Sequence, residues 1–131
     1  MTQSIRTGGC LCAGVTFEIK GSLRPVLACH CSQCRKTSGH YWAATEVRCD
    51  QINIRDVGTL RWYRSSEFAR RGFCNRCGAS IFWQEDARDE SISIGAGCID
   101  IPTGLAMGAH IFVEDASDYY RIPMDDKQRS G

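Results

Sequence analysis

The stretch Cys74-Asn75-Arg76-Cys77-Gly78-Ala79 decides the fold, because it supplies half of a site whose other half lies far away in the sequence. A Cys-x-x-Cys followed by Gly is typical of a zinc knuckle, where a tight turn brings two thiolates to one metal. Cys10 and Cys12 supply the second pair, since residues i and i+2 of a strand face the same way. Four thiolates form a closed, structural site. We expect this site to close a loop of about sixty residues.

A second cysteine cluster lies at Cys29-His30-Cys31-Ser32-Gln33-Cys34. Cys29 and Cys31 share a face of an extended segment, and Cys31 and Cys34 form another knuckle. Three protein ligands leave the fourth position of a zinc ion open, which is the pattern of a catalytic zinc acting as a Lewis acid. The sequence therefore predicts two zinc ions per chain, one structural and one catalytic.

Other arrangements of these cysteines remain open. The second site is closed and structural if His30, Cys49 or Cys98 supplies a fourth ligand. His30 lies between two ligands, so its side chain should point to the opposite face of an extended segment. Cys49 and Cys98 are also expected as small buried apolar residues. A single multinuclear cluster of all seven thiolates is a further alternative.

The composition sets the class of protein and its surroundings. The chain has 131 residues and a formal charge of +1, which favours a single domain over residues 1–131 with a core at about 7–122. Seven thiolates and two divalent ions bring that charge to −2, which argues against nucleic acid as a partner. Residues 1–9 resemble no signal peptide, and no apolar run reaches the length of a membrane span. We expect a cytoplasmic protein whose nine cysteines bind metal rather than form a secreted disulfide scaffold.

Short apolar segments that alternate with turn residues predict an all-β fold of short antiparallel sheets. The expected strands are Val15–Lys20, Tyr41–Val47, Gln51–Arg55, Leu60–Arg64, Ser80–Trp83, Ser91–Ile94 and His110–Val113. One short helical turn is expected after the second cluster, over Ser32–Thr37 and ended by Gly39. The charged tail after Ile122 is expected to be frayed.

Several residues near the second cluster are candidates for binding or acid–base chemistry. Arg35 and Lys36 directly follow the cluster and can bind substrate carboxylates, while Ser38 and Gly39 can offer a hydroxyl and backbone N–H groups. The pair Arg70-Arg71 can bind carboxylates too, but a solvated face is favoured there. His40 and His110 are candidate acid–base groups, although histidines beside aromatics are more often packed or exposed. The aromatic residues Trp42, Trp62, Tyr63 and Trp83 are expected in the core or at its rim.

Three segments in this order resemble the glutathione-dependent formaldehyde-activating enzyme family, whose domain also occurs in centromere protein V. They are residues 8–15 (GGCLCAGV), 29–39 (CHCSQCRKTSG) and 73–78 (FCNRCG). The stretches His110–Val113 and Asp118–Tyr120 fit the same family, so that the resemblance covers about Thr7 to Ile122.

This resemblance implies an all-β fold with two zinc sites. Cys10, Cys12, Cys74 and Cys77 match the ligands of the structural zinc, and Cys29, Cys31 and Cys34 match those of the catalytic zinc. The implied activity is carbon–sulfur lyase chemistry, the formation or cleavage of S-hydroxymethylglutathione from glutathione and formaldehyde. A small thiol or thiol adduct is then the expected partner, and its sulfur takes the open position on the zinc. A non-catalytic zinc-binding adaptor and a redox sensor that releases zinc are the alternative functions.

Overall fold

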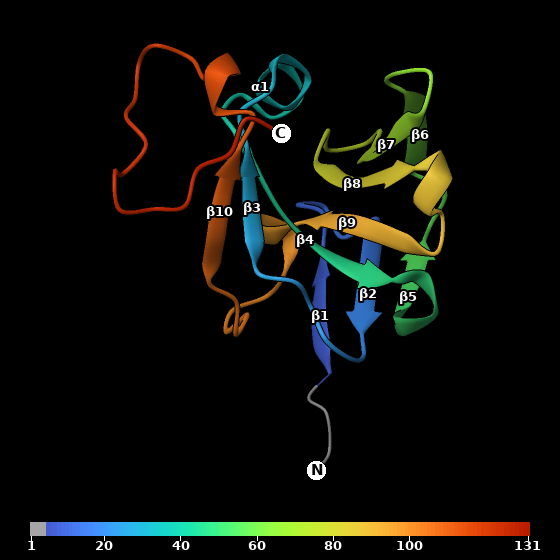
Figure 1. The fold of residues 1–131 in the computed structure, drawn as a ribbon. Coiled ribbons are helices and arrows are strands. Elements are labelled where there is room, and N and C mark those ends of the chain that lie inside the picture. Colours follow the sequence, from blue (N-terminus) through green and yellow to red (C-terminus); the bar gives the residue numbers. More distant parts are fainter. Residues whose placement is uncertain (1–4) are drawn as a thin grey trace.

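The computed structural model describes residues 5–131, which form two β-sheets and one α-helix (Figure 1). The strands are β1 (Arg6–Gly9), β2 (Val15–Ile19), β3 (Val26–Cys29), β4 (Trp42–Arg48), β5 (Ile52–Asp56), β6 (Leu60–Arg64), β7 (Ala69–Cys74), β8 (Ser80–Glu85), β9 (Ser91–Gly95) and β10 (Met107–Ile111). The helix α1 spans Ser32–Ser38, and short 3-10 turns cover Cys49–Gln51, Asp86–Arg88, Ala96–Cys98 and Val113–Asp115. The predicted all-β fold with one helical turn after the second cysteine cluster is confirmed.

The two sheets differ in size. The smaller sheet has the order β1-β2-β5, and the larger has the order β10-β3-β4-β9-β8-β7-β6. All of these pairings are antiparallel except that of β10 with β3, which is parallel. The antiparallel sheets expected from the sequence therefore include one parallel pair at the edge of the larger sheet.

The main core lies between the two sheets, because the strands alternate apolar side chains with a period of two. Phe17 of β2 packs against Phe82 of β8, with ring centroids 5.9 Å apart. Ile94 and Val47 are fully or almost fully buried in the same cluster. The opposite face of the larger sheet does not pack against the smaller sheet.

Three strands were not expected from the sequence. β1 contains two glycines, β3 is only four residues long, and β7 carries two arginines. These features weaken an apolar alternation, which is the signal that reveals a strand in a sequence. The helix matches its prediction closely, since Gly39 adopts a left-handed φ of 87° at its C-cap and donates its N–H to Arg35.

The tail after Ile122 is not frayed throughout, contrary to expectation. The N–H of His110 in β10 donates to the carbonyl of Lys127, and the N–H of Arg129 donates to the carbonyl of His110, both at 2.8 Å. The tail thus pairs alongside the edge of the larger sheet, close to the end of the chain (Figure 1). None of the helices in residues 5–131 has the length and apolar character needed to cross a membrane.

Candidate metal centres and the adjoining cavity

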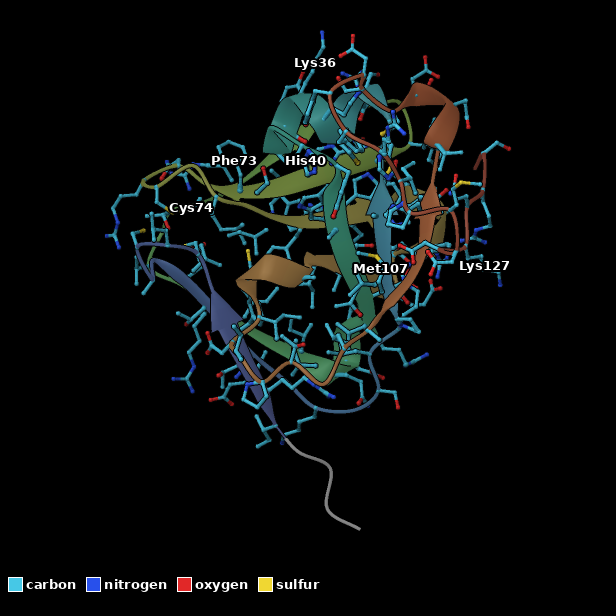
Figure 2. The ribbon with its side chains drawn as sticks, turned by 90° about the vertical axis from the view of Figure 1, so that its left-hand side faces the viewer. Lys36, His40, Phe73, Cys74, Met107 and Lys127 are labelled. Atoms are coloured by element: carbon cyan, nitrogen blue, oxygen red, sulfur yellow. The ribbon has the colours of Figure 1, made fainter. Side chains whose placement is uncertain are left out.

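The first candidate metal centre joins the two sheets. Cys10 and Cys12 lie in the turn after β1, and Cys74 and Cys77 lie at the end of β7 and in the turn that follows it. The four sulfurs lie within 4.8 Å of one another. Figure 2 shows Cys74 beside the turn that links β1 to β2. An all-sulfur set of four ligands at this spacing fits a closed tetrahedral metal site.

Hydrogen bonds to several of these sulfurs favour negative charge on them, while burial raises the pKa of Cys10. The N–H of Val15 donates to Cys10 Sγ at 3.3 Å, and Arg76 Nε donates to Cys12 Sγ at 3.2 Å. The Thr59 hydroxyl, 3.4 Å from Cys74 Sγ, is the main cause that lowers the pKa of Cys74 to about 6. Thiolates are the form that binds a metal, so these contacts favour occupation of the site.

The second candidate metal centre is a group of three cysteines at the start of α1. Cys29 ends β3, Cys31 is the N-cap of α1, and Cys34 lies in its first turn. Their sulfurs also lie within 4.8 Å of one another. The N–H of Cys34 points at Cys31 Sγ over 3.4 Å, so this sulfur occupies the position of a helix cap. Three sulfur ligands within six consecutive residues, 29–34, can hold one metal ion.

Hydrogen bonds among the three cysteine side chains couple the protonation of their sulfurs. The thiol of Cys29 and then that of Cys34 hydrogen-bond to the sulfur of Cys31 and lower the pKa of Cys31. The same interaction raises the pKa of Cys29. A group that holds one thiolate so readily is well suited to attract a divalent cation.

No fourth protein ligand joins this group among the described residues. The Cys49 thiol instead hydrogen-bonds to the carbonyl of Asp89, and Cys98 packs beside the main core. His30 is fully buried and turned away from the neighbouring sulfurs, as the extended segment predicts. The second centre therefore differs from the first in having three ligands rather than four.

A cavity of about 330 Å³ adjoins the three-cysteine centre. It lies over one face of the larger sheet, because the strand register brings Arg71 of β7, Trp83 of β8 and Ser93 of β9 into one row. Cys29, Cys31 and Cys34 all line it. The remaining lining residues are mostly apolar: Leu27, Trp42, Ala44, Phe68, Ala69, Ile111 and Phe112, with Arg24, Ser32, Gln33 and Ser66.

The two neighbouring arginines of β7 point to opposite faces of the sheet. The Arg70 guanidinium stacks over the Trp62 ring at 4.0 Å and donates to Gln84 Oε1 at 2.7 Å. Arg71 instead lies in the cavity, where its Nη2 is 3.5 Å from Cys34 Sγ. The sequence favoured a solvated face for this pair, and the structure places neither arginine fully in solvent.

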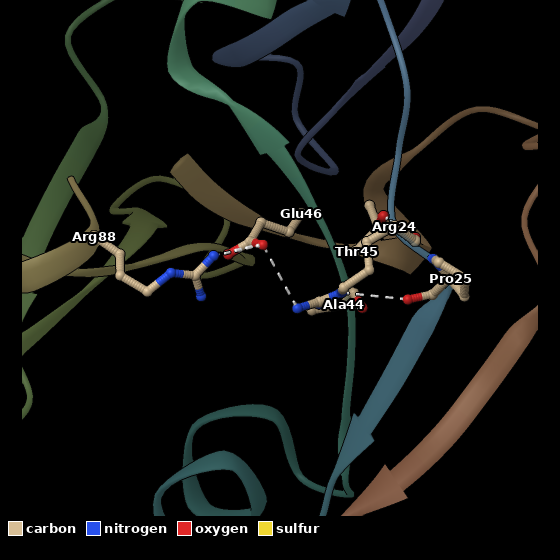
Figure 3. Close-up of polar contacts among 6 residues, drawn as sticks. All are labelled: Arg24, Pro25, Ala44, Thr45, Glu46 and Arg88. Atoms are coloured by element: carbon tan, nitrogen blue, oxygen red, sulfur yellow. Dashed lines mark hydrogen bonds and ion pairs between the residues drawn. The ribbon is translucent and has the colours of Figure 1, made fainter. Parts of the chain in front are cut away.

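Arg24, the other arginine of the cavity, is held by polar contacts (Figure 3). Its Nη2 donates to the carbonyl of Ala44 at 3.1 Å, and its Nη1 lies 4.0 Å from Glu46. Glu46 also pairs with Arg88 at 3.0 Å. The charge of Arg24 is thus partly balanced before any ligand enters.

The residues that the sequence offered for substrate binding lie outside this lining. Arg35 donates from Nε to the carbonyl of Asp115, and Lys36 projects outward from α1 (Figure 2). The Ser38 hydroxyl donates to the carbonyl of Cys34, and Gly39 caps the helix. The structure brings none of these four residues to the cavity. The cavity lining takes Ser32, Gln33 and Cys34 from the start of α1, whereas these four residues lie farther along the helix or at its end. Their role in substrate binding stays a prediction.

The histidines form a separate network. Asp126 lies 3.0 Å from His110 Nε2, His110 Nδ1 lies 2.9 Å from His30 Nε2, and the Tyr120 hydroxyl hydrogen-bonds to His30 Nδ1. A run of donors from Tyr120 through His30 and His110 to Asp126 satisfies every one of these polar atoms. His40 pairs with the Tyr119 hydroxyl at 2.5 Å. His30, His40 and His110 do not line the cavity. Because His30 lies between Cys29 and Cys31, its hydrogen bonds to Tyr120 and His110 hold this segment in place.

Fold and sites together define a small, cysteine-rich β-protein with one four-sulfur centre between its sheets and one three-sulfur centre beside a cavity. The chain belongs to the glutathione-dependent formaldehyde-activating enzyme family, whose profile matches residues 5–115. The family resemblance read from the cysteine motifs is thereby confirmed.

Two individual proteins are also similar to this chain. The chain is 25% identical over 117 residues to an uncharacterized lyase of Schizosaccharomyces pombe, covering 86% of this chain and 82% of that protein. It also resembles the crystal structure of a Rhodobacter sphaeroides protein with a TM-score of 0.62 and 22% identity, covering 75% of this chain and 91% of the other. The structural likeness concerns the fold alone.

Proposed function

We propose that this protein is a zinc-dependent carbon–sulfur lyase that makes or breaks the bond between a thiol sulfur and the carbonyl carbon of a small aldehyde. The observation that carries this proposal is the three-cysteine centre, which lacks a fourth ligand among the described residues and opens on a cavity of about 330 Å³. Family membership and the name of the fission-yeast relative support lyase chemistry. S-hydroxymethylglutathione is the reference substrate that the family's name suggests.

The reaction balances without any redox partner. In the direction of synthesis, the thiol loses its proton, and a lone pair on its sulfur forms a bond to the carbonyl carbon. The C=O π bond breaks at the same time, and the carbonyl oxygen takes up a proton to give a hydroxyl group. Cleavage is the reverse, and it releases the thiol and the aldehyde.

The residues of this chain divide the work. Cys29, Cys31 and Cys34 would hold the zinc ion, while Cys10, Cys12, Cys74 and Cys77 would hold a second, structural ion. A zinc ion held by these three thiolates would supply Lewis acidity and would favour the thiolate form of a substrate thiol near neutral pH. The Trp42 and Trp83 rings line the cavity and give it an apolar wall for the body of a substrate. The positive charge of Arg71 lies beside Cys34 and favours an anionic ligand there.

Exchange spectroscopy tests the activity directly, because S-hydroxymethylglutathione forms and decays spontaneously and an enzyme must speed that exchange. The zinc-loaded protein is expected to raise the NMR exchange rate between formaldehyde and its glutathione adduct in proportion to protein concentration. Cys34→Ser, which removes a sulfur from the second centre, should abolish the increase. Cys49→Ser is the matched control, since Cys49 belongs to neither centre.

The activity assay must also include other thiols. Acceleration with a different small thiol but not with glutathione would keep the lyase proposal and change only its substrate. A zinc-loaded, folded protein that accelerates exchange for no thiol contradicts the lyase proposal and favours a non-catalytic zinc-binding adaptor.

A further inference from the structure

We infer that the preferred substrate is a thiol, or its aldehyde adduct, with an apolar body and a carboxylate on or next to the carbon that bears the sulfur, and not the tripeptide glutathione. This inference rests on the lyase function proposed above and names the substrate class for the same cavity. Three features of the cavity carry it: a cation without a carboxylate partner among the described residues, the distance of that cation from the cysteine sulfurs, and the chemistry of the walls.

Arg71 is a cavity cation that has no carboxylate partner in residues 5–131. Its Nη2 lies 3.5 Å from Gln33 Oε1, beyond the usual range of about 2.7–3.2 Å for an N–H···O bond. Nη2 also lies 3.5 Å from Cys34 Sγ, and the guanidinium carbon lies 5.9 Å from the centre of the Trp42 ring. Its Nε is buried and has no acceptor in the described part of the chain. A buried donor left unsatisfied in this way is costly, so a ligand that supplies an acceptor gains affinity.

Arg71 differs in this respect from its neighbours. Arg70 has a ring to stack on and an amide oxygen to bind, and Arg24 has Glu46 and a backbone carbonyl. Of the two arginines that line the cavity, Arg71 is the one with a buried side-chain nitrogen that has no hydrogen-bond partner in the described residues. A carboxylate accepts two parallel N–H bonds from a guanidinium, which suits the unsatisfied Nε and the loosely held Nη2.

The distance from Arg71 to the cysteines fixes where that carboxylate must be. Nη2 lies 3.5 Å from Cys34 Sγ. If the sulfur of a ligand lies beside the cysteine sulfurs, the ligand atoms one or two bonds from that sulfur therefore lie near the guanidinium. A carboxylate on or next to the sulfur-bearing carbon reaches it. Glutathione carries its carboxylates at the two ends of the tripeptide, several bonds from its sulfur, and it presents an amide at this place instead.

The walls favour an apolar body over a zwitterionic one. Trp42, Trp83 and Phe68 line the cavity, and none of its described lining residues is Asp or Glu. The ammonium group of glutathione would therefore find no carboxylate there, and an unpaired charge in a confined site is expensive. The volume of about 330 Å³ also lies near the lower end of the range for ligand pockets, about 300–1,000 Å³.

A competing explanation gives Arg71 a purely local role, in which it balances the negative charge of the metal-bound Cys34. The two explanations predict different effects of an Arg71 substitution on ligand binding. A charge-balancing arginine affects every thiol ligand alike, whereas a carboxylate-binding arginine affects only ligands that carry the carboxylate.

Tryptophan fluorescence separates them, since Trp42 and Trp83 line the cavity. The zinc-loaded protein is titrated with 2-sulfanyl-3-phenylpropanoate, with its primary amide, and with glutathione. The carboxylate is expected to bind about tenfold or more tightly than the amide, as a charge-assisted hydrogen bond implies, and more tightly than glutathione. Arg71→Gln should remove the preference for carboxylate over amide. Arg70→Gln, the neighbouring arginine on the other face, should keep it.

Each other result is decisive. If Arg71→Gln weakens carboxylate and amide equally while their ratio stays unchanged, Arg71 serves the metal centre and the inference is overturned. If glutathione binds more tightly than the phenyl compound, the proposed substrate class is wrong while the lyase function stands. If none of the three thiols perturbs the fluorescence or the bound metal, the inference is overturned, and the exchange assay with other thiols decides the lyase proposal separately. Measurement of the zinc content of each variant confirms that the centres are intact.

Discussion

Cys12 Sγ and Cys74 Sγ lie 3.6 Å apart although 62 positions separate them in the sequence. Cys12 belongs to the turn of the smaller sheet, and Cys74 ends a strand of the larger one. A metal ion held by these sulfurs and by those of Cys10 and Cys77 would fasten the two sheets together. The three-cysteine centre, in contrast, lies within a single local segment, so the two centres should affect stability differently.

Each chain is expected to bind two zinc ions, since two separate sulfur groups are present. Elemental analysis of protein purified without chelators should return a ratio near two, and Cys34→Ser should reduce it to near one. A ratio of one in the unsubstituted protein would contradict the assignment of two centres.

Cys74→Ser is expected to destabilise the fold far more than Cys31→Ser. A closed structural zinc contributes of order 10 kcal/mol to folding, and Cys74 is one of four ligands that link the sheets. Cys31 also caps α1 through its sulfur, but serine is an equally good cap. Thermal melts of both variants, each with its metal content measured, check this order. Equal damage, or the reverse order, would show that the centres do not divide into structural and functional roles.

Asp126→Asn is expected to cost about 1 kcal/mol of stability, because it replaces a hydrogen bond between a carboxylate and a buried histidine by one to a neutral amide. His110 is 4% exposed, and its Nε2 lies 3.0 Å from the Asp126 carboxylate. Asp125→Asn is the control, since Asp125 is exposed. Urea denaturation of the two variants makes the comparison. Identical midpoints would support a frayed tail, as the sequence alone suggested.

Gly8→Ala is expected to destabilise the protein by about 1–3 kcal/mol through steric overlap. A Cβ at this position would overlap the carbonyl oxygen of Cys98 and would lie 2.6 Å from the Phe17 ring. Gly97→Ala provides the control, because a Cβ there meets nothing within 4 Å. Denaturant melts should show a clear loss for the first variant and little change for the second.

The cysteine spacing carried most of what the sequence could reveal. Pairs at i, i+2 and i, i+3 are local, so Cys10–Cys12, Cys74–Cys77 and the group from Cys29 to Cys34 could be recognised without a structure. Strands such as Leu60–Arg64 and Val15–Ile19 were visible for a similar reason, since their residues alternate or are rich in aromatic and β-branched types. Both signals depend only on neighbours in the chain.

The lining of the cavity could not be predicted, because it depends on strand order. Arg71 meets Trp83 across β7 and β8, and it approaches Cys34 from a strand 37 positions away. No local pattern separates Arg71 from Arg70, although consecutive residues of a strand face opposite sides. If β7 had been recognised as a strand, one of the two arginines would have been predicted to face the interior. The two adjacent charged residues interrupt the apolar alternation, so the strand was not predicted.

The open position on the second centre is the central claim, and cobalt substitution tests it most directly. Titration of the cobalt-loaded protein with a small thiol should change the sulfur-to-metal charge-transfer band, whereas the corresponding S-methyl thioether should leave the band unchanged. Cys34→Ser should remove the response, while Cys49→Ser should retain it. A band that no thiol alters would mean that the ion held by Cys29, Cys31 and Cys34 has no free position for a substrate sulfur, and would contradict the account.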